Sequence, residues 1–394
     1  MSASSTVTSA SGTDHPAMGR TVLKAPSAAP TTGVPGVSSL TSRGAPCRRI
    51  AAPSLQMVHV SDPADSRSRT RQTVLVTGGA GYVGVPLVDE LQRSGRDVRV
   101  LDVLLHGQEG VAARLRQRGV EVIVGDIRDP DARRCALDGA QAVVHLAAIV
   151  GDPACARDPE LSQAVNVDGS HALAADARAL GVSHLVFAST CSNYGRMADP
   201  TVPIGEDGVL APVSLYAQQK VGIERELLGS SNGMATTCLR FATVYGVAPR
   251  MRFDLTVNEF TLWLWAGRTL EVFGEQFWRP YIHVNDAARA VRTVLDAPAD
   301  HVAGEVFNAG RSAENYRKLD LVEAIREQLP DRGEVRFVHR DEDPRDYKVS
   351  FEKIRRVLGF ETSLTVPLGI AEIIATLERG ALPDAFDRRY RNIP

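Results

Sequence analysis

The sequence predicts an α/β fold, in which a parallel, doubly wound sheet is followed by a smaller C-terminal α/β lobe. From residue 73 onward, short β-branched runs alternate with longer helical stretches. This alternation is typical of a parallel sheet with helices on both faces. After about residue 245 it ends, and irregular segments containing Trp and Arg indicate a cap over the carboxyl edge of the sheet.

Five strands of the sheet are visible as short apolar runs. The first, Thr73–Thr77, is rich in Val and Leu, which is typical of a strand buried on both faces. The other strands are expected over 97–102, 121–124, 141–146 and 184–189. Helices are expected over 82–93, 109–118 and 158–180.

The 394 residues divide into three parts by composition. In residues 1–70, Ser, Thr, Ala, Pro and Gly occupy 43 positions and aromatic residues are absent, so this extension is expected to be disordered. Its basic, Ser-rich character also resembles an organelle transit peptide, and a start codon assigned too early is a third interpretation. We expect a dinucleotide-binding domain over 73–245 and an intertwined substrate-binding lobe over 246–394.

The overall charge excludes some classes of partner. The chain has 45 basic and 47 acidic residues, so it has no net field that would attract nucleic acid or an anionic membrane. No apolar run is long enough to span a bilayer. The five cysteines form no CxxC pair, and no cluster has metal-ligand spacing, so no metal is expected. These features favour a cytoplasmic protein, with organelle targeting as the minority alternative.

Glycines follow the first strand at a spacing that suits a phosphate. Gly78, Gly81 and Gly84 form a GxxGxxG pattern between that strand and the first helix. Glycine allows positive φ and a close approach of the backbone to a pyrophosphate, and the helix N-terminus offers free N–H groups. We therefore expect a dinucleotide here, held also by Tyr82 and Val83. A turn with a purely structural role is the alternative.

Carboxylates follow the second and third strands. Asp102 lies 18 residues after Gly84, at the strand end where a carboxylate accepts the adenosine ribose hydroxyls. Because an acid there repels the 2′-phosphate of NADP, NAD is the expected cofactor. After the third strand, Asp126 is expected to meet the adenine amino group, with Ile127 beside it. The alternative for Asp126 is a plain turn residue.

Tyr216 and Lys220 form a YxxxK pair, whose members share one face of a helix. An ammonium beside a phenol favours the phenolate and lowers the pKa of the phenol from about 10. Such a phenol can take or give a proton at a carbinol oxygen, and the same lysine can reach the nicotinamide ribose. The segment 189–195 lies at the carboxyl end of the fifth strand, where ligands bind. A hydroxyl from it can polarise the same oxygen.

Together these residues resemble the extended short-chain dehydrogenases/reductases, in the NAD-dependent nucleotide-sugar epimerase/dehydratase group (UDP-glucose 4-epimerase-like). The resemblance covers about residues 73–375. It rests on the segments Thr77–Gly84, His145–Ala148, Asn166–Ser170, Ser189–Gly195, Tyr216 with Lys220, Arg240–Gly246 and Arg279–Val284. It implies a Rossmann-type sheet, bound NAD, a nucleotide-diphosphate sugar as substrate and a homodimer.

The resemblance also implies roles for single residues. Thr190 holds the position of the family's catalytic Ser or Thr, Tyr216 is the acid/base, and Lys220 is its partner. The residues implied to line the cofactor channel are Leu146, Ala147 and Ala148.

Further roles concern the substrate. Arg279 matches the arginine that binds the sugar-nucleotide diphosphate, with a surface salt bridge as its alternative. Thr243 is a further implied substrate contact. Arg345 is a second candidate for the phosphates, with a surface role as its alternative. Asn166 is expected either to be structural or to lie near the nicotinamide.

Two positions depart from the family pattern. The 4,6-dehydratases of the family resemble one another in an Asp-Glu pair just after the catalytic Thr, which assists loss of water. Here these positions hold Cys191 and Ser192, which argues against dehydration and weakens the sugar-acid decarboxylase reading. Cys191 is either a small packing residue or an acid/base for epimerisation at a ring carbon.

The expected function is a nucleotide-sugar epimerase that inverts C4 through a transient 4-keto intermediate. The alternatives are a 4-ketoreductase, an epimerase at another carbon or a decarboxylase on the same scaffold. A non-catalytic NAD-binding protein is a further alternative, against which the intact Tyr216, Lys220 and Thr190 argue. The nucleotide and the sugar are not readable from the sequence.

Overall fold

The computed structural model describes residues 72–197, 199, 202–230, 233–340 and 345–392. The extension over 1–70, on which several expectations fall, lies outside the described residues. In the part of the chain that is described, no helix is long and apolar enough to cross a membrane.

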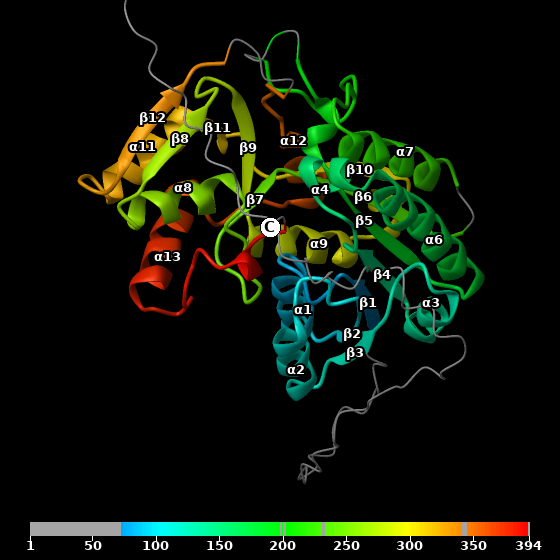
Figure 1. Cartoon of the computed structure of the whole chain (residues 1–394). Helices are drawn as coiled ribbons and strands as arrows, with labels where there is room; N and C mark the ends of the chain where they lie inside the picture. The colour runs from blue at the N-terminus through cyan, green and yellow to red at the C-terminus, as the bar shows by residue number, and fades with distance from the viewer. Residues whose placement is uncertain (1–71, 198, 200–201, 231–232, 341–344, 393–394) are drawn as a thin grey trace, which may run out of the picture. The chain divides into compact units, whose positions relative to one another are not determined.

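The main sheet has seven parallel strands in the order β10-β6-β5-β4-β1-β2-β3 (Figure 1). The chain order reverses between β1 and β4, which creates the crevice in which doubly wound sheets bind ligands. The strands are β1 (Thr73–Thr77), β2 (Asp97–Asp102), β3 (Glu121–Val124), β4 (Ala142–His145), β5 (His184–Thr190), β6 (Ala235–Phe241) and β10 (Glu305–Ala309). The predicted fold class is confirmed.

Helices cover both faces of this sheet because its strands are apolar on both sides. In β1, Val74 and Val76 join the core under α1, α2 and α9, whereas Leu75 joins the core under α3, α6 and α7. The covering helices are α1 (Gly84–Arg93), α2 (Glu109–Gln117), α3 (Pro130–Leu137), α6 (Gly169–Ala179), α7 (Leu215–Gly229) and α9 (Val284–Asp296).

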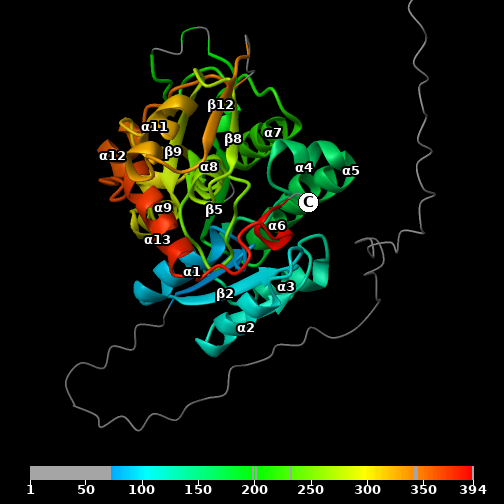
Figure 2. The same ribbon diagram turned by 60° about the vertical axis from the view of Figure 1, so that its left-hand side comes forward.

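The second lobe contains two small sheets and a core of its own (Figure 2). Its strands are β7 (Thr243–Tyr245), β9 (Trp278–His283) and β11 (Asn315–Arg317) in one sheet, with β8 (Thr269–Phe273) and β12 (Glu334–Val338) in the other. Its helices are α8 (Thr256–Trp265), α11 (Lys318–Gln328) and α13 (Val366–Glu378). The helices α10 (Ala299–Val302) and α12 (Glu352–Leu358) pack instead on the core of the main sheet, through Val302 and Ile354. Because β10 and α9 return to the main sheet, the two lobes are intertwined.

The helix expected over 158–180 is present from Pro159 to Ala179, as α5 (Pro159–Ser162), a π-helical segment (Gln163–Asp168) and α6 without a gap. A separate short helix that was not expected, α4 (Asp152–Arg157), precedes it. Pro159 cannot continue a helix from α4, and the Asp158 carboxylate accepts the Leu161 N–H to start α5. Apolar periodicity alone could not reveal the π-helical segment, because a π-helix differs in hydrogen-bond spacing and not in composition.

Candidate active site

The glycine turn after β1 leaves room for a ligand at the backbone. Gly78 has φ +71°, and a Cβ there would come within 2.9 Å of the Ala147 nitrogen. A Cβ at Gly84 would lie 2.3 Å from the Gly78 oxygen. Only glycine therefore fits, and α1 begins directly at Gly84 with its N-terminal N–H groups facing the turn. This cradle fits a pyrophosphate.

Residues from three segments lie next to the turn, and their contacts with the cofactor stay predictions. Leu146, Ala147 and Ala148 follow β4, and Ala147 donates its N–H to the Thr77 hydroxyl at the start of the turn (3.3 Å). Tyr82 reaches the other lobe, where its hydroxyl donates to the Gly246 carbonyl (2.7 Å). Val83 packs against the cores of both lobes.

Asp102 lies at the end of β2, where its carboxylate can accept hydrogen bonds from the hydroxyl groups of a ribose. It is 7% exposed, and its two oxygens accept N–H bonds from Ala80 (3.0 Å) and Leu104 (2.8 Å). Burial raises the pKa of this carboxyl above its usual range. Each oxygen keeps one lone pair, so the carboxylate can accept further hydrogen bonds from a ribose.

Asp126 is already engaged within the protein. It forms an ion pair with Arg128 (2.6 Å). Although burial raises the pKa of Asp126, the bonds from Arg128 bring it below the usual range. Its contact with adenine stays a prediction. Ile127 is buried and packs against Gly169 at the start of α6.

Tyr216 and Lys220 lie one turn apart on α7, next to the end of β5. The Lys220 ammonium donates to the Ala188 carbonyl (2.7 Å) and lies 4.4 Å from the centre of the Phe187 ring. Its distance to the centre of the Tyr216 ring is 5.8 Å. Burial lowers the pKa of Lys220 to about 8.

The titration of Tyr216 differs from the sequence-based expectation. Lys220 was expected to lower the pKa of this phenol, but burial raises it, and Arg252 is the cation that lowers it in part. The physical reason is that the Lys220 ammonium points to the Ala188 carbonyl. Among the described residues, the Tyr216 hydroxyl has no hydrogen-bond partner, and its raised pKa means that the NAD-free protein holds it as a neutral phenol.

The residues at and just after the end of β5 include two hydroxyl side chains, Thr190 and Ser192, and one buried thiol, Cys191. Thr190 accepts the Ser192 N–H (3.1 Å), and the Ser192 hydroxyl meets the Tyr347 hydroxyl (3.4 Å). Cys191 is 1% exposed, and its thiol donates to the Arg240 carbonyl (3.2 Å). Burial raises the pKa of this thiol well above its usual value. The geometry favours the packing role of Cys191 over proton exchange.

The two predicted phosphate-binding arginines come from the second lobe. Arg279 in β9 is buried, donates to the Trp278 carbonyl (2.7 Å) and lies 5.3 Å from the centre of the Tyr347 ring. Arg345 forms an ion pair with Asp152 of α4 (3.0 Å). Arg345 is therefore tied to a carboxylate, while Arg279 packs on Tyr347, whose hydroxyl contacts Ser192 just after β5.

Sequence reasoning missed three residues that surround Tyr216 and Thr190. Asp152 and Cys155, both in α4, lie close enough to raise the pKa of Tyr216, and Tyr347 contacts Ser192. The signal for the first two was their place directly after β4, at the ligand-binding edge of the sheet. No local pattern marks Tyr347.

Other predicted residues act mainly within the fold. Asn166 holds the loop after β4 through the Ile149 N–H (2.7 Å) and carbonyl (3.0 Å), which favours its structural interpretation. His145 is buried between Thr77 and Ser170, and burial lowers its pKa to about 3, so it stays neutral. Thr243 is partly buried in β7, opposite Tyr281 of β9.

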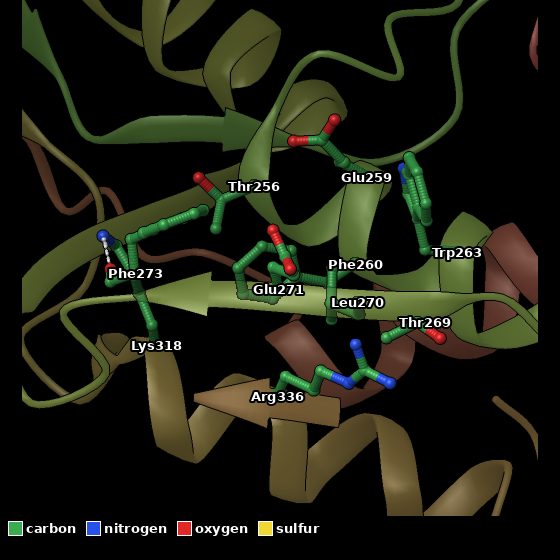
Figure 3. A pocket seen from close by; sticks show the side chains of 10 residues that line it. All are labelled: Thr256, Glu259, Phe260, Trp263, Thr269, Leu270, Glu271, Phe273, Lys318 and Arg336. Carbon is green, nitrogen blue, oxygen red and sulfur yellow. Dashed lines mark hydrogen bonds between the residues drawn. The ribbon is translucent and has the colours of Figure 1, made fainter. Parts of the chain in front are cut away.

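A pocket of about 590 Å³ lies in the second lobe, between α8 and the β8–β12 sheet (Figure 3). It is lined by Thr256, Glu259, Phe260, Trp263, Thr269, Leu270, Glu271, Phe273, Lys318 and Arg336. Its walls combine aromatic rings with both signs of charge, which suits a polar, planar group. Across the described residues, no group of three His, Cys, Asp or Glu could hold a metal ion.

A profile of the NAD dependent epimerase/dehydratase family matches residues 74–310. The chain belongs to this family. It is 33% identical to UDP-glucose 4-epimerase from Mycolicibacterium smegmatis over 308 residues, which span 76% of this chain and 96% of that protein. The cofactor of this epimerase/dehydratase chain is NAD.

Solved structures of two different enzymes resemble it equally well. Thermus thermophilus UDP-glucose 4-epimerase in complex with NAD is 28% identical, with a TM-score of 0.69 over 79% of this chain and 100% of that one. A dTDP-glucose 4,6-dehydratase from Streptomyces venezuelae with NAD and TYD bound is 26% identical, with a TM-score of 0.69 over 79% and 98%. The fold of the epimerase/dehydratase family is therefore clear, and the reaction must be argued from the site.

Proposed function

We propose that this chain is a nucleotide-sugar epimerase that inverts C4 with tightly held NAD. The observation that carries the proposal is the grouping of Tyr216 and Lys220 on α7 beside Thr190 at the end of β5, with no acid/base group at the two positions that follow Thr190. This arrangement supports proton transfer at one carbinol oxygen and offers no second acid or base there for eliminating water.

The residues act on a single oxygen of the sugar. In the NAD-free protein Tyr216 is a neutral phenol, and the positive charge of a bound nicotinamide would favour its phenolate. As a phenolate, Tyr216 removes the proton from the C4 hydroxyl and later returns it, while the Thr190 hydroxyl donates a hydrogen bond to the same oxygen. The bound NAD supplies a hydride acceptor and donor for C4. Lys220 orients the ribose next to the nicotinamide. The 4-keto sugar rotates between the two transfers, so the net reaction needs no external reductant.

The substrate's phosphates and nucleotide would contact the second lobe. Arg279 offers a guanidinium fork to the diphosphate, next to Tyr347 at the end of β5. The α8–β8 pocket has room for the nucleotide, with Phe273 available for stacking and Lys318 at its rim. Thr243 of β7 and Arg345 are further candidate contacts. We also expect the protein to be cytoplasmic and to form a homodimer. Light scattering on the purified protein tests the homodimer by measuring the mass of the assembly.

The panel that tests this function contains UDP-, dTDP-, GDP- and CDP-sugars, each incubated with purified protein and no added cofactor. Mass spectrometry and NMR should find a product of unchanged mass with inverted C4. Conversion that starts only when NADH or NADPH is added, with a gain of two mass units, would instead identify a ketoreductase. Loss of about 18 mass units, the mass of water, would identify a dehydratase. Loss of about 44 mass units, the mass of carbon dioxide, would identify a decarboxylase.

Cys191→Ala should leave turnover within about a factor of three, because a buried thiol that points to the Arg240 carbonyl takes no part in the reaction. Steady-state kinetics on the sugar found with the panel measure this. A fall in kcat of about 100-fold, the usual size for loss of an acid/base, would instead place the thiol in catalysis.

Asp102→Ala should weaken NAD binding by about 10- to 100-fold, because the ribose hydroxyls lose a charged acceptor. Asp97→Ala, at the exposed start of the same strand, is the matched control and should bind NAD normally. Titration calorimetry measures both. Equal affinities for the two variants would remove the argument that Asp102 selects NAD.

A further inference from the structure

The loop between β7 and α8 holds a buried cation that the proposed mechanism does not use. The Arg250 side chain is 7% exposed, and its Nε and Nη2 atoms are enclosed without a hydrogen-bond partner among the described residues. A guanidinium in a protein keeps its proton. Enclosing such a charge without hydrogen bonds is strongly unfavourable, unless a ligand completes them.

Arg250 faces the region in which the cofactor's adenosine half would bind. Its charge reaches Asp102 at the end of β2 and Tyr82 in the glycine turn. It also contributes to lowering the pKa of His106, which follows β2, although burial is the larger cause. Arg250 therefore lies near both the glycine turn and the carboxylate expected to bind the ribose. The loop that carries Arg250 also touches the turn directly, because the Tyr82 hydroxyl donates to the carbonyl of Gly246 at the start of the loop (2.7 Å).

The other charges of this loop are already neutralised within the protein. Arg252 forms a two-pronged pair with Asp254 (3.0 and 2.9 Å). The Asp102 oxygens accept the N–H groups of Ala80 and Leu104 and are not hydrogen-bonded to Arg250. Among Arg250, Arg252, Asp254 and Asp102, Arg250 is consequently the only cation without a hydrogen bond to a carboxylate.

The loop is held in place before any ligand arrives. Phe253 donates its N–H to the Tyr390 carbonyl (2.7 Å), and Asn392 donates its N–H to Asp254 (3.1 Å). Asn258 of α8 donates to the Arg252 carbonyl (2.8 Å). A fixed loop gives Arg250 a defined position, which lowers the entropic cost of binding.

We propose that Arg250 binds the diphosphate of NAD, opposite the glycine turn. The turn and the N-terminus of α1 supply only neutral N–H donors to this doubly negative group. A guanidinium adds a formal positive charge and a rigid fork of donors, which suits phosphate oxygens. The two lobes would thereby hold the diphosphate from both sides. This inference rests on NAD as the cofactor and is independent of the reaction at C4.

The test compares Arg250→Met with Arg99→Met in the full chain. Arg99 has the same exposure (7%), but all its contacts are made within the protein, to Glu121 and to the carbonyls of Ala136 and Asp138. The readouts are the NAD content of the purified protein, the rate of NAD release under a chase of excess ADP-ribose, and the melting temperature with and without NAD.

We expect Arg250→Met to release NAD about 10- to 100-fold faster, the factor that corresponds to one lost charge-assisted hydrogen bond. Its melting temperature without NAD should not fall, because Met removes an unpaired buried charge. Arg99→Met should show the opposite pattern: a lower melting temperature and unchanged NAD release. Arg250→Lys, which keeps the charge without the fork, should be intermediate and provides a second variant if Met disturbs folding.

Three results would overturn the proposal. The first is NAD release from Arg250→Met at the parent rate. The second is a lower melting temperature without NAD, together with faster release, which would make Arg250 a structural residue. The third comes from competition assays: if the variant loses affinity for NADP but keeps it for NAD and ADP-ribose, the residue contacts a 2′-phosphate and not the diphosphate. Failure of any sugar to react would leave these binding results standing.

Discussion

Tyr216→Phe is expected to reduce epimerisation by about 10²- to 10⁴-fold or more, the range for loss of a general acid/base. NAD binding and folding should persist, because the Tyr216 hydroxyl makes no hydrogen bond to the described residues and the ring remains. The measurement is kcat on the sugar found with the panel, together with the NAD content of the purified variant.

A matched control separates chemistry from packing in this experiment. Tyr245→Phe removes a buried hydroxyl in the core of the second lobe that also has no hydrogen-bond partner there. It should keep near-parental kcat. A Tyr216→Phe protein that retained a tenth of the parental kcat would contradict the proposed acid/base role.

Lys220→Met is expected to abolish turnover and yet to stabilise the NAD-free protein at neutral pH. Burial lowers the pKa of Lys220 from 10.5 to about 8, which means that the folded protein disfavours its ammonium. That shift corresponds to a cost of about 3 kcal/mol at pH 7. Loss of the bond to the Ala188 carbonyl offsets about 1–2 kcal/mol of the gain, so a net stabilisation of about 1–2 kcal/mol is expected.

The stability difference between Lys220→Met and the parent should change with pH in a defined direction. Between about pH 8 and 10.5 the unfolded chain binds more protons at Lys220 than the folded one, so the parent gains stability as the pH rises through this window. The advantage of the variant should therefore be largest below pH 8 and shrink toward pH 10.5. Urea unfolding at several pH values measures it. Lys353→Met, at a partly exposed lysine paired with Glu305, is the control and should show no such trend.

A variant less stable than the parent at pH 7, by the same amount at every pH, would contradict this account of Lys220. It would mean that the bond to Ala188 outweighs the cost of burying the ammonium. The comparison thus tests whether the site stores an unfavourable charge for the sake of catalysis, as functional sites often do.

The parts of the site that local chemistry fixes were predictable from the sequence. Gly78 and Gly84 had to be glycine because backbone atoms lie where a Cβ would be. The placement of Asp102 follows from the length of one βαβ unit, and the YxxxK spacing places Tyr216 and Lys220 on one helix face. Each of these signals lies within one element or one turn of the chain.

What could not be predicted depends on contacts between distant segments. The direction of the Lys220 ammonium is set by the Ala188 carbonyl, 32 positions away, and that of the Cys191 thiol by the Arg240 carbonyl. The Asp152–Arg345 pair joins α4 to a loop 193 positions later. No periodicity or motif encodes such pairings. The unpaired state of Arg250 likewise becomes visible only when the surrounding lobes are in place.

The measurement that tests the central claim most directly is the reaction in D₂O, with the sugar found by the panel and no added cofactor. If hydrogen leaves C4 and returns to C4 within the site, the product has inverted C4, and NMR finds no deuterium on any ring carbon. Deuterium at a carbon next to C4 would mean that the enzyme inverts that carbon by proton exchange, and would contradict C4 epimerisation by Tyr216, Lys220 and Thr190.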